Sequence, residues 1–412
     1  MTPAHDFIVV AEGVYRCEVP DVGMVLHVDR LRRKSGELWG ELTVTCSLAG
    51  AHRLNDEDVI SAADLNFSSV RARQDRASLL SKRSRFPEHD WFGSVEYFCQ
   101  RTIQAERVGQ PSVLLRDVRK PDPDLTWTVH GLPIVKRQPM ILFGDGGAGK
   151  STLALSIAGT LAQQGIPGLY CDWETDEAEH RQKLEELFGD TMPDVRYVRC
   201  ASPLIHEVDR LRREILVHGI EYIVVDSAGV ACSGAPEAAE SANEFFRGLR
   251  QLHVGALVLA HVTKSEGGEH RPFGSVFWGN NARSTWFVKR SDADGDAGQM
   301  TLALWHRKSN SGPLLSPRGL RLRFGEDQIE IRPTDLTDSE QFAPTLPLWQ
   351  RMKGQLSPGP MTLEALAEEI GAKPDSVKKV VDRSQHRKDP MFTRVVGADG
   401  QTRISLVARR FA

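Results

Sequence analysis

The segment GDGGAGKS at residues 144–151 constrains the fold of this chain more than any other feature. It fits the pattern Gly-x-x-x-x-Gly-Lys-[Ser/Thr] in full. An apolar run at residues 140–143 precedes it, and a helical pattern at residues 152–163 follows it. In this context the glycines let backbone N–H groups turn inward around a phosphate at a helix N-terminus. The segment therefore predicts a phosphate-binding loop between a strand and a helix.

The side chains at the end of this loop predict how a nucleoside triphosphate is held. Lys150 is expected to reach the β- and γ-phosphates of ATP, and the Ser151 hydroxyl is expected to bind Mg²⁺. The predicted nucleotide-binding residues are Gly144, Asp145, Gly146, Gly147, Ala148, Gly149, Lys150, Ser151 and Thr152.

A buried strand is predicted at residues 222–226, where four apolar residues end in Asp226. A carboxylate at the tip of such a strand is expected to hold Mg²⁺ together with Ser151. The next residue is Ser227 and not glutamate. This excludes the arrangement in which the water-activating carboxylate directly follows the metal-binding aspartate, so the catalytic base must come from another segment.

Glu174 is the predicted catalytic base, because it lies just beyond the strand predicted at residues 168–172. A carboxylate there can orient and deprotonate the attacking water. Asp172 is the second choice for this role. The alternative is that Glu174 only favours the N-terminus of the next helix, where Asp176 and Glu179 already have capping-box spacing.

A further predicted strand, residues 256–260, places His261 at its end, where a polar side chain can sense the γ-phosphate. The glycine-rich segment that follows, residues 265–281, carries Arg271, Phe273, Phe277 and Trp278. In a ring such a loop can face the central channel, where cations follow a single-stranded DNA backbone and aromatic side chains stack on bases. The alternative is a surface loop with its aromatic side chains packed beneath it.

Near-continuous apolar strands alternate with helical patterns over residues 126–335. This alternation predicts an α/β domain with a mainly parallel sheet covered by helices on both faces. Proline-rich linkers are expected at residues 121–124 and 341–347.

The N-terminal part, residues 1–120, predicts a small α+β domain of unknown role. Strands are expected between residues 7 and 46, with a hairpin turn at residues 34–37, and helical spacing is expected between residues 59 and 108. The basic residues at positions 69–85 are predicted on a solvated helix face, with nucleic-acid contact as the alternative.

The C-terminal part, residues 347–412, predicts three helices followed by a β hairpin. It holds twelve Lys and Arg residues against seven Asp and Glu residues, although the whole chain has a net charge of −3. The element order resembles a winged helix-turn-helix, in which the third helix contacts duplex DNA. The predicted DNA contacts are Lys378, Lys379, Arg383 and the hairpin residue Arg394, with Arg403 on the same hairpin. Winged helices also serve as protein-docking domains, which is the alternative.

Length and composition restrict the remaining possibilities. A chain of 412 residues is too long for one hydrophobic core and predicts two to three domains. No run of about 18 apolar residues and no secretory signal is found, so a cytoplasmic protein without membrane contact is expected. The six cysteines show no zinc or disulfide spacing and are predicted to be reduced packing residues.

Together these motifs resemble the RecA-fold ATPases of plasmid and phage hexameric helicases, the RepA-like type classed as AAA_25 and related to DnaB and KaiC. The matching segments are GDGGAGKS at 144–151, YCDWETD at 170–176, YIVVDSAG at 222–229, LAHVTK at 259–264, FGSVFWGNNAR at 273–283 and HRKSNSGP at 306–313. The resemblance covers about half of the chain. It implies a RecA-like core that uses ATP and Mg²⁺ in a homo-oligomer, expected to be a hexamer.

The same resemblance implies a cation that reaches the γ-phosphate bound by a neighbouring subunit. Lys308 stands at the family's lysine position, but Asn310 stands where the family has arginine. Arg283 or Arg307 could substitute; the alternative is weak turnover or a different ring state.

The predicted function is that of an ATP-dependent DNA motor, a RepA-like helicase of a mobile element. The alternative is a nucleotide-switched DNA-binding regulator or loader ATPase that does not unwind DNA. The N-terminal domain is a candidate adaptor for a primase or initiator protein.

Overall fold

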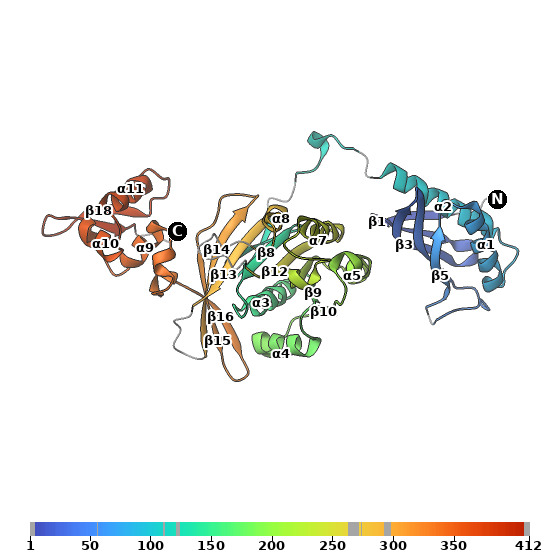
Figure 1. Cartoon of the computed structure of the whole chain (residues 1–412), viewed down its shortest axis with the longest axis horizontal. Coiled ribbons are helices and arrows are strands. Elements are labelled where there is room, and N and C mark those ends of the chain that lie inside the picture. The colour runs from blue at the N-terminus through green and yellow to red at the C-terminus, as the bar shows by residue number, and fades with distance from the viewer. Residues whose placement is uncertain are drawn as a thin grey trace. The chain divides into compact units, whose positions relative to one another are not determined.

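The chain divides after Pro121 into two units, Met1–Pro121 and Asp122–Ala412. Figure 1 traces the chain through both. The computed structural model describes residues 5–55, 57–109, 112–120, 124–262, 272, 274–291 and 298–407. The division falls at the first predicted linker, of which residues 121–123 lie outside the described residues.

A five-stranded antiparallel sheet and two helices share one hydrophobic core in the N-terminal unit. The strands lie side by side in chain order. Ser35 and Gly36, between the third and fourth strands, have φ angles of 53° and 82°, as a tight hairpin turn requires. The elements are β1 (Asp6–Ala11), β2 (Val14–Val19), β3 (Met24–Lys34), β4 (Glu37–Cys46), β5 (Val59–Asn66), α1 (Val70–Ser84) and α2 (Trp91–Val108).

The helical prediction for residues 59–66 is wrong, because this segment is the edge strand β5, paired with β4. Arg76 and Arg83 of α1 donate hydrogen bonds to β5 carbonyl groups, at 3.1 Å to Asp64 and 2.6 Å to Ile60. The alanines of the segment favour a helix intrinsically, but strand pairing and these donors decide its structure.

The prediction of a solvated basic face in α1 is wrong for Arg73 and Arg76, which are buried. Arg73 forms an ion pair with Glu96 at 2.9 Å, and Arg76 donates to Ser61 Oγ at 2.5 Å. A buried guanidinium is stable only when its donors find partners. These two arginines therefore hold the N-terminal core together.

Nine strands form the sheet of the second unit, in the order β10-β9-β11-β12-β8-β13-β14-β15-β16. All pairings from β10 to β13 are parallel and the other three are antiparallel, which confirms the mainly parallel sheet. The strands are β8 (Pro139–Gly144), β9 (Gly168–Asp172), β10 (Val195–Arg199), β11 (Tyr222–Asp226), β12 (Gly255–Ala260), β13 (Ser284–Arg290), β14 (Gln299–Ser309), β15 (Arg318–Phe324) and β16 (Ile329–Thr334).

Helices cover both faces of this sheet, and each face has its own hydrophobic core (Figure 1). One core contains side chains of α3 (Lys150–Gln163), α4 (Glu177–Phe188) and the hairpin of β6 (Thr126–Val129) and β7 (Leu132–Val135). The other contains side chains of α5 (Leu204–His218), α6 (Ala228–Ala231), α7 (Ala239–Gln251) and α8 (Val276–Asn281).

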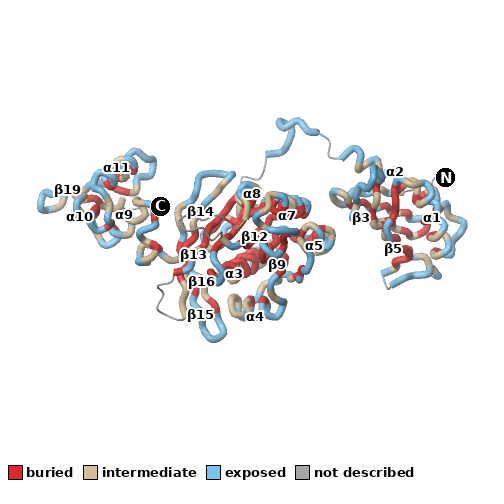
Figure 2. The backbone as a smooth tube through the Cα atoms, in the orientation of Figure 1, coloured by how far each residue is buried: buried red, intermediate tan, exposed pale blue. Residues whose placement is uncertain are grey.

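The strands β8, β9, β11 and β12 are buried along their whole length, as Figure 2 shows for the centre of this unit. Their carboxyl ends meet at one edge of the sheet, where α/β proteins bind ligands. All six cysteines of the chain are buried and unpaired, as predicted. Among the helices that the structure describes, none is long and apolar enough to cross a bilayer.

The C-terminal elements have a separate hydrophobic cluster. The three helices and the hairpin occur in the predicted order, and β17 joins the hairpin in the strand order β17-β19-β18. The elements are α9 (Leu348–Gln355), β17 (Met361–Thr362), α10 (Leu363–Glu369), α11 (Pro374–Gln385), β18 (Phe392–Val396) and β19 (Thr402–Leu406). They belong to the second unit, so a third, winged-helix domain stays a prediction.

The second predicted linker, residues 341–347, is an anchored segment and not a free connection. It contains the short 3-10 helix Ala343–Thr345, and the side chains of Phe342 and Leu346 are buried against Ala303 and Leu336. The prolines that indicate a linker in the sequence instead flank two core side chains.

We therefore expect Phe342→Ala to lower the free energy of unfolding by about 3–5 kcal/mol, as large-to-small changes in cores do. Urea unfolding monitored by circular dichroism would measure the loss. Phe324→Ala is the matched control, because Phe324 is 38% exposed. Equal stability of the two variants would show that residues 341–347 are a linker after all.

Candidate active site

The phosphate-binding loop connects β8 to α3 as predicted, with Gly149 as the N-cap of the helix. Gly147 and Gly149 have φ angles of 70° and 74°, a conformation that favours glycine. Gly144 is required for a different reason, because a Cβ atom there would lie 2.3 Å from the Val288 carbonyl oxygen. The glycines therefore supply both the turn of the loop and its fit against β13.

Lys150 is buried at the start of α3, and its Nζ donates to the carbonyl groups of Gly144 at 3.0 Å and Asp145 at 2.7 Å. Burial lowers the pKa of the ammonium group, whereas the carboxylates of Asp226, Glu174 and Asp145 favour its charged form. The charge of Lys150 therefore lies inside the loop and next to the predicted metal and base residues.

Asp226 ends β11 and is buried, and its carboxylate accepts hydrogen bonds from Ser151 and from the Tyr170 hydroxyl at 2.7 Å. Burial raises its pKa, and the hydrogen bonds from Tyr170 and Ser151 oppose that rise. The structure thus brings the two predicted magnesium ligands into direct contact.

A hydroxyl group beside a carboxylate fits Mg²⁺, which takes one or two protein oxygens and completes its shell with phosphate and water. Within the described residues, no group of three or more His, Cys, Asp or Glu side chains is arranged to hold a metal ion. Ser151 and Asp226 therefore fit Mg²⁺ that is bound together with a nucleotide.

Glu174 reaches this site from the turn after β9. Ser227, the residue that follows the predicted metal ligand Asp226, donates its hydroxyl to Glu174 Oε1. The Glu174 side chain is exposed, so water can reach it. Glu174 as the base stays a prediction, and the structure shows a partner of its side chain, Ser227, that the sequence analysis missed.

Asp172 is not available as the second-choice base. Its fully buried carboxylate accepts hydrogen bonds from the Glu174 amide at 2.9 Å, the Thr175 amide at 3.0 Å and the Tyr197 hydroxyl at 2.9 Å. Burial by itself would raise its pKa, but the hydrogen bonds from His180, Glu174 and Tyr197 hold the pKa well below its usual range. Asp172 shapes the turn that presents Glu174.

The loop after β12 is described only at its ends. His261 follows the strand directly and is exposed at the same sheet edge. The predicted DNA contacts Arg271 and Phe273 lie outside the described residues. Trp278 is not free to stack on bases, because it is buried against Phe245 and Phe246 and donates to the Pro236 carbonyl at 2.9 Å.

Lys308 is not a free trans-acting cation. Its Nζ donates to three carbonyl groups at the C-terminal end of α8, those of Gly279, Asn280 and Ala282, at 2.7–2.8 Å. A cation at that end also interacts favourably with the helix dipole. All three N–H donors are therefore used within the chain.

The other two trans-acting candidates, Arg283 and Arg307, are exposed. The Arg307 guanidinium lies 5.7 Å from the centre of the Phe287 ring. Of the three predicted cations, these two are exposed, whereas Lys308 is engaged within the chain.

The C-terminal basic residues likewise include exposed side chains and side chains that are paired within the chain. Lys378, Lys379 and Arg383 are exposed on α11. Arg394 instead binds Asp382 and Gln385, and Arg403 binds Asp399. The hydrogen bond from Arg394 holds the pKa of Asp382 below its ordinary value. The prediction that Arg394 contacts DNA therefore competes with an internal ion pair.

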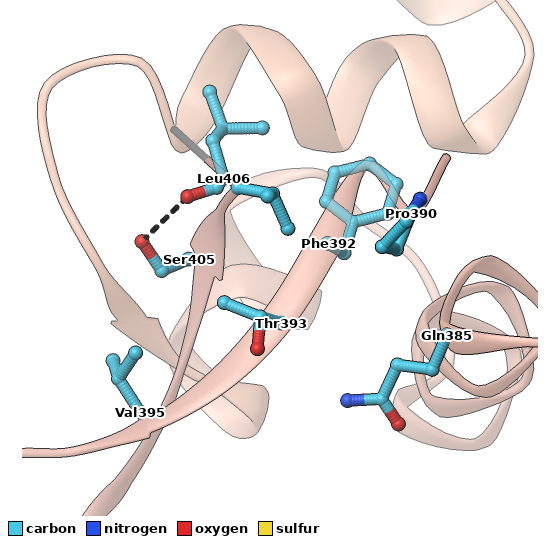
Figure 3. Close-up of a pocket in the computed structure, with 8 residues that line it drawn as sticks. Gln385, Pro390, Phe392, Thr393, Val395, Ser405 and Leu406 are labelled. Atoms are coloured by element: carbon cyan, nitrogen blue, oxygen red, sulfur yellow. Dashed lines mark hydrogen bonds between the residues drawn. The ribbon is translucent and has the colours of Figure 1, made fainter. Parts of the chain in front are cut away.

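A pocket of about 380 Å³ lies between the end of α11 and the hairpin (Figure 3). The residues that line it are Gln385, Pro390, Phe392, Thr393, Val395, Ser405, Leu406 and Val407. None of these residues is charged.

A phosphate-binding loop, a hydroxyl–carboxylate pair for Mg²⁺ and a reachable second carboxylate, all at the carboxyl edge of this sheet, define the core as a RecA-like P-loop ATPase fold. Residues 104–267 match the family model AAA_25, described as an AAA domain. The curated "DNA repair protein RadA" of Campylobacter jejuni is 27% identical over 139 residues, which are 33% of this chain and 31% of that protein. The chain thus matches about a third of the length of this relative.

Similar solved structures include a KaiC-like protein of Pyrococcus horikoshii, with 16% identity and a TM-score of 0.39 over 48% of this chain and 91% of that one. The ATPase domain of G40P has 13% identity and a TM-score of 0.39, covering 46% and 82% of the two chains. A DnaB-like replicative helicase has the same identity and TM-score, covering 46% and 56%. The class of the core rests on its own strand order and loop.

Glu174→Gln keeps the size of the side chain and can still accept the Ser227 hydrogen bond, but it cannot take a proton. We expect nucleotide binding to persist while the rate of ATP hydrolysis falls by roughly 10²-fold or more. Phosphate release and fluorescent-nucleotide binding measure the two properties. Glu177→Gln, three residues further on and exposed, is the control, and a wild-type rate in Glu174→Gln would remove it as the base.

Proposed function

We propose that this chain is a Mg²⁺-dependent ATPase that acts on DNA as a RepA-like helicase of a mobile element. The convergence of Lys150, Ser151, Asp226 and Glu174 at one sheet edge carries the ATPase part of the proposal. The DNA part is supported by the exposed basic residues of α11 and by the matched relative, which is named a DNA repair protein.

Each of these residues has a separate task in the proposed hydrolysis. The loop amides and Lys150 bind the phosphates and neutralise charge on the transferred phosphoryl group. Ser151 and Asp226 hold Mg²⁺, which supplies further neutralisation of the phosphate oxygens when bound. Glu174, oriented by Ser227, positions the attacking water and accepts its proton. His261 senses the γ-phosphate at the end of β12.

Lys150→Ala should abolish hydrolysis of Mg·ATP, because it removes the cation that compensates the developing charge. Release of inorganic phosphate from the purified variant is the measurement. Lys183→Ala is the matched control, since Lys183 lies on α4 in the same unit and pairs with Glu179. Hydrolysis at the wild-type rate in Lys150→Ala would contradict the assignment of the site.

We further propose that the chain works as a homo-oligomer, as a hexameric ring, with the loop after β12 facing single-stranded DNA through Arg271 and Phe273. Arg283 and Arg307 are the proposed cations that reach the neighbouring nucleotide, because they are exposed while Lys308 is engaged. A primase or initiator protein is the proposed partner of the N-terminal unit.

Duplex DNA is proposed to bind the basic residues of α11. Neutralising Lys378, Lys379 and Arg383 together to Gln should weaken binding and reduce the dependence of affinity on salt, because fewer counterions are released from phosphates. Fluorescence anisotropy of the full chain at several salt concentrations measures this, and basal ATPase activity should not change. Replacing Arg394, which already pairs with Asp382, is the comparison variant.

An unchanged salt slope in the triple variant would mean that the C-terminal elements dock a protein. It would leave the ATPase assignment intact, since the nucleotide site lies upstream of residue 347.

One observation favours the second candidate, a nucleotide-switched regulator or loader ATPase. Lys308 caps α8, and Asn310 stands at the expected arginine position. Without a strong cation that reaches the neighbouring subunit's γ-phosphate, ATP hydrolysis would be slow. Slow hydrolysis suits a switch better than a motor. ATP-dependent strand displacement on forked DNA supports the helicase, whereas ATP-controlled duplex binding without displacement supports the regulator.

A further inference from the structure

Tyr170 is a buried polar side chain that the hydrolysis scheme does not use. It lies in β9, two residues before Asp172, and is 1% exposed. Its hydroxyl donates to Asp226 Oδ2 at 2.7 Å, across the parallel pairing of β9 with β11. A hydrogen bond to a buried charged acceptor is stronger than an ordinary one. Tyr170 therefore holds the predicted metal carboxylate from inside the protein.

The ring of Tyr170 contacts the other half of the site. It packs on His180 with the ring centres 4.5 Å apart. His180 Nε2 lies 2.9 Å from Thr175 Oγ1 and 3.4 Å from Asp172 Oδ2. Asp172 and Thr175 belong to the turn that presents Glu174, because the Glu174 and Thr175 amides donate to the Asp172 carboxylate.

Two donors share the Asp226 carboxylate, Tyr170 and Ser151. Ser151 is itself a predicted magnesium ligand, so its hydroxyl has a second task. Tyr170 comes from the sheet and not from the phosphate-binding loop, and its buried ring packs on His180. It is therefore suited to keep the carboxylate in one orientation.

We propose that Tyr170 is a positioning residue, which orients Asp226 for Mg²⁺ and joins it to the turn that carries Glu174. This inference rests on the proposed nucleotide site. This role has a specific consequence. Loss of the Tyr170 hydroxyl should reduce the gain in nucleotide affinity that Mg²⁺ provides. The affinity for nucleotide in the absence of metal should not change.

The chain offers a matched control, because Tyr197 also donates its hydroxyl to a buried carboxylate of the same network. That bond reaches Asp172 Oδ2 at 2.9 Å and does not reach the metal carboxylate. Tyr170→Phe and Tyr197→Phe thus each remove one hydroxyl group, and the two lost hydrogen bonds reach different carboxylates. Circular dichroism and thermal unfolding would establish that both variants fold.

The measurement is the affinity of a fluorescent ADP analogue for the full chain, with Mg²⁺ and with EDTA. In the wild-type chain Mg²⁺ should tighten binding. In Tyr170→Phe the gain in affinity with Mg²⁺ should fall by about tenfold, because one hydrogen bond to a charged group is lost. The affinity measured in EDTA should not change. Tyr197→Phe should keep the wild-type tightening. In an Asp226→Asn background, Tyr170→Phe should cause no further loss.

Three results would overturn the role of Tyr170: wild-type tightening in Tyr170→Phe, equal losses in the two tyrosine variants, or equal weakening with and without Mg²⁺. A further loss in the Asp226→Asn background would also do so. Absence of any Mg²⁺ effect in the wild-type chain would instead remove the proposed nucleotide–metal site, so the two failures are distinguishable.

Discussion

Parallel pairing of β8, β9, β11 and β12 is the constraint on which the rest of this core depends. The register places Asp226 opposite Asp172 and Ala260 opposite Phe143. Backbone hydrogen bonds fix this register, so the residues that follow each strand arrive at one edge of the sheet. Segments that are far apart in the chain, from the phosphate-binding loop to His261, therefore reach the same edge of the sheet.

The same edge must accommodate several buried charges. Asp172 and Asp226 lie opposite each other, yet the pKa of the first is lowered and that of the second is raised. Burial is the largest influence on both groups and raises both pKa values; hydrogen bonds outweigh it at Asp172, whereas at Asp226 they do not, and the nearby carboxylates of Glu174 and Asp172 raise the pKa further. Asp172 receives hydrogen bonds from the Glu174 and Thr175 amides of its own turn and from the Tyr197 hydroxyl of β10, whereas Asp226 receives them from Tyr170 and Ser151. Asp172 is thereby satisfied as a structural anion, and Asp226 retains capacity for a cation.

Several side chains have a role in the structure that differs from the prediction. Lys308 and Trp278 lie in sequence contexts that indicate contact with other molecules, but they cap and anchor α8. Arg73 lies on a helix face predicted to be solvated and Phe342 in a predicted linker, yet both are buried. A local pattern reports charge and spacing, while burial depends on partners elsewhere in the chain. Glu96 and Leu336, which contact Arg73 and Phe342, are such partners.

The sequence alone determined the phosphate-binding loop, the strand and helix that flank it and the aspartate that ends β11, because each is encoded in a short run of residues. The glycine pattern and the apolar runs have local physical causes, namely positive φ angles and burial on both faces of the sheet. Only the tertiary structure decided that Tyr170 binds Asp226, that Ser227 holds Glu174 and that Asp172 is anchored. These contacts join separate segments, and their geometry follows from strand register and side-chain packing, which no local pattern encodes.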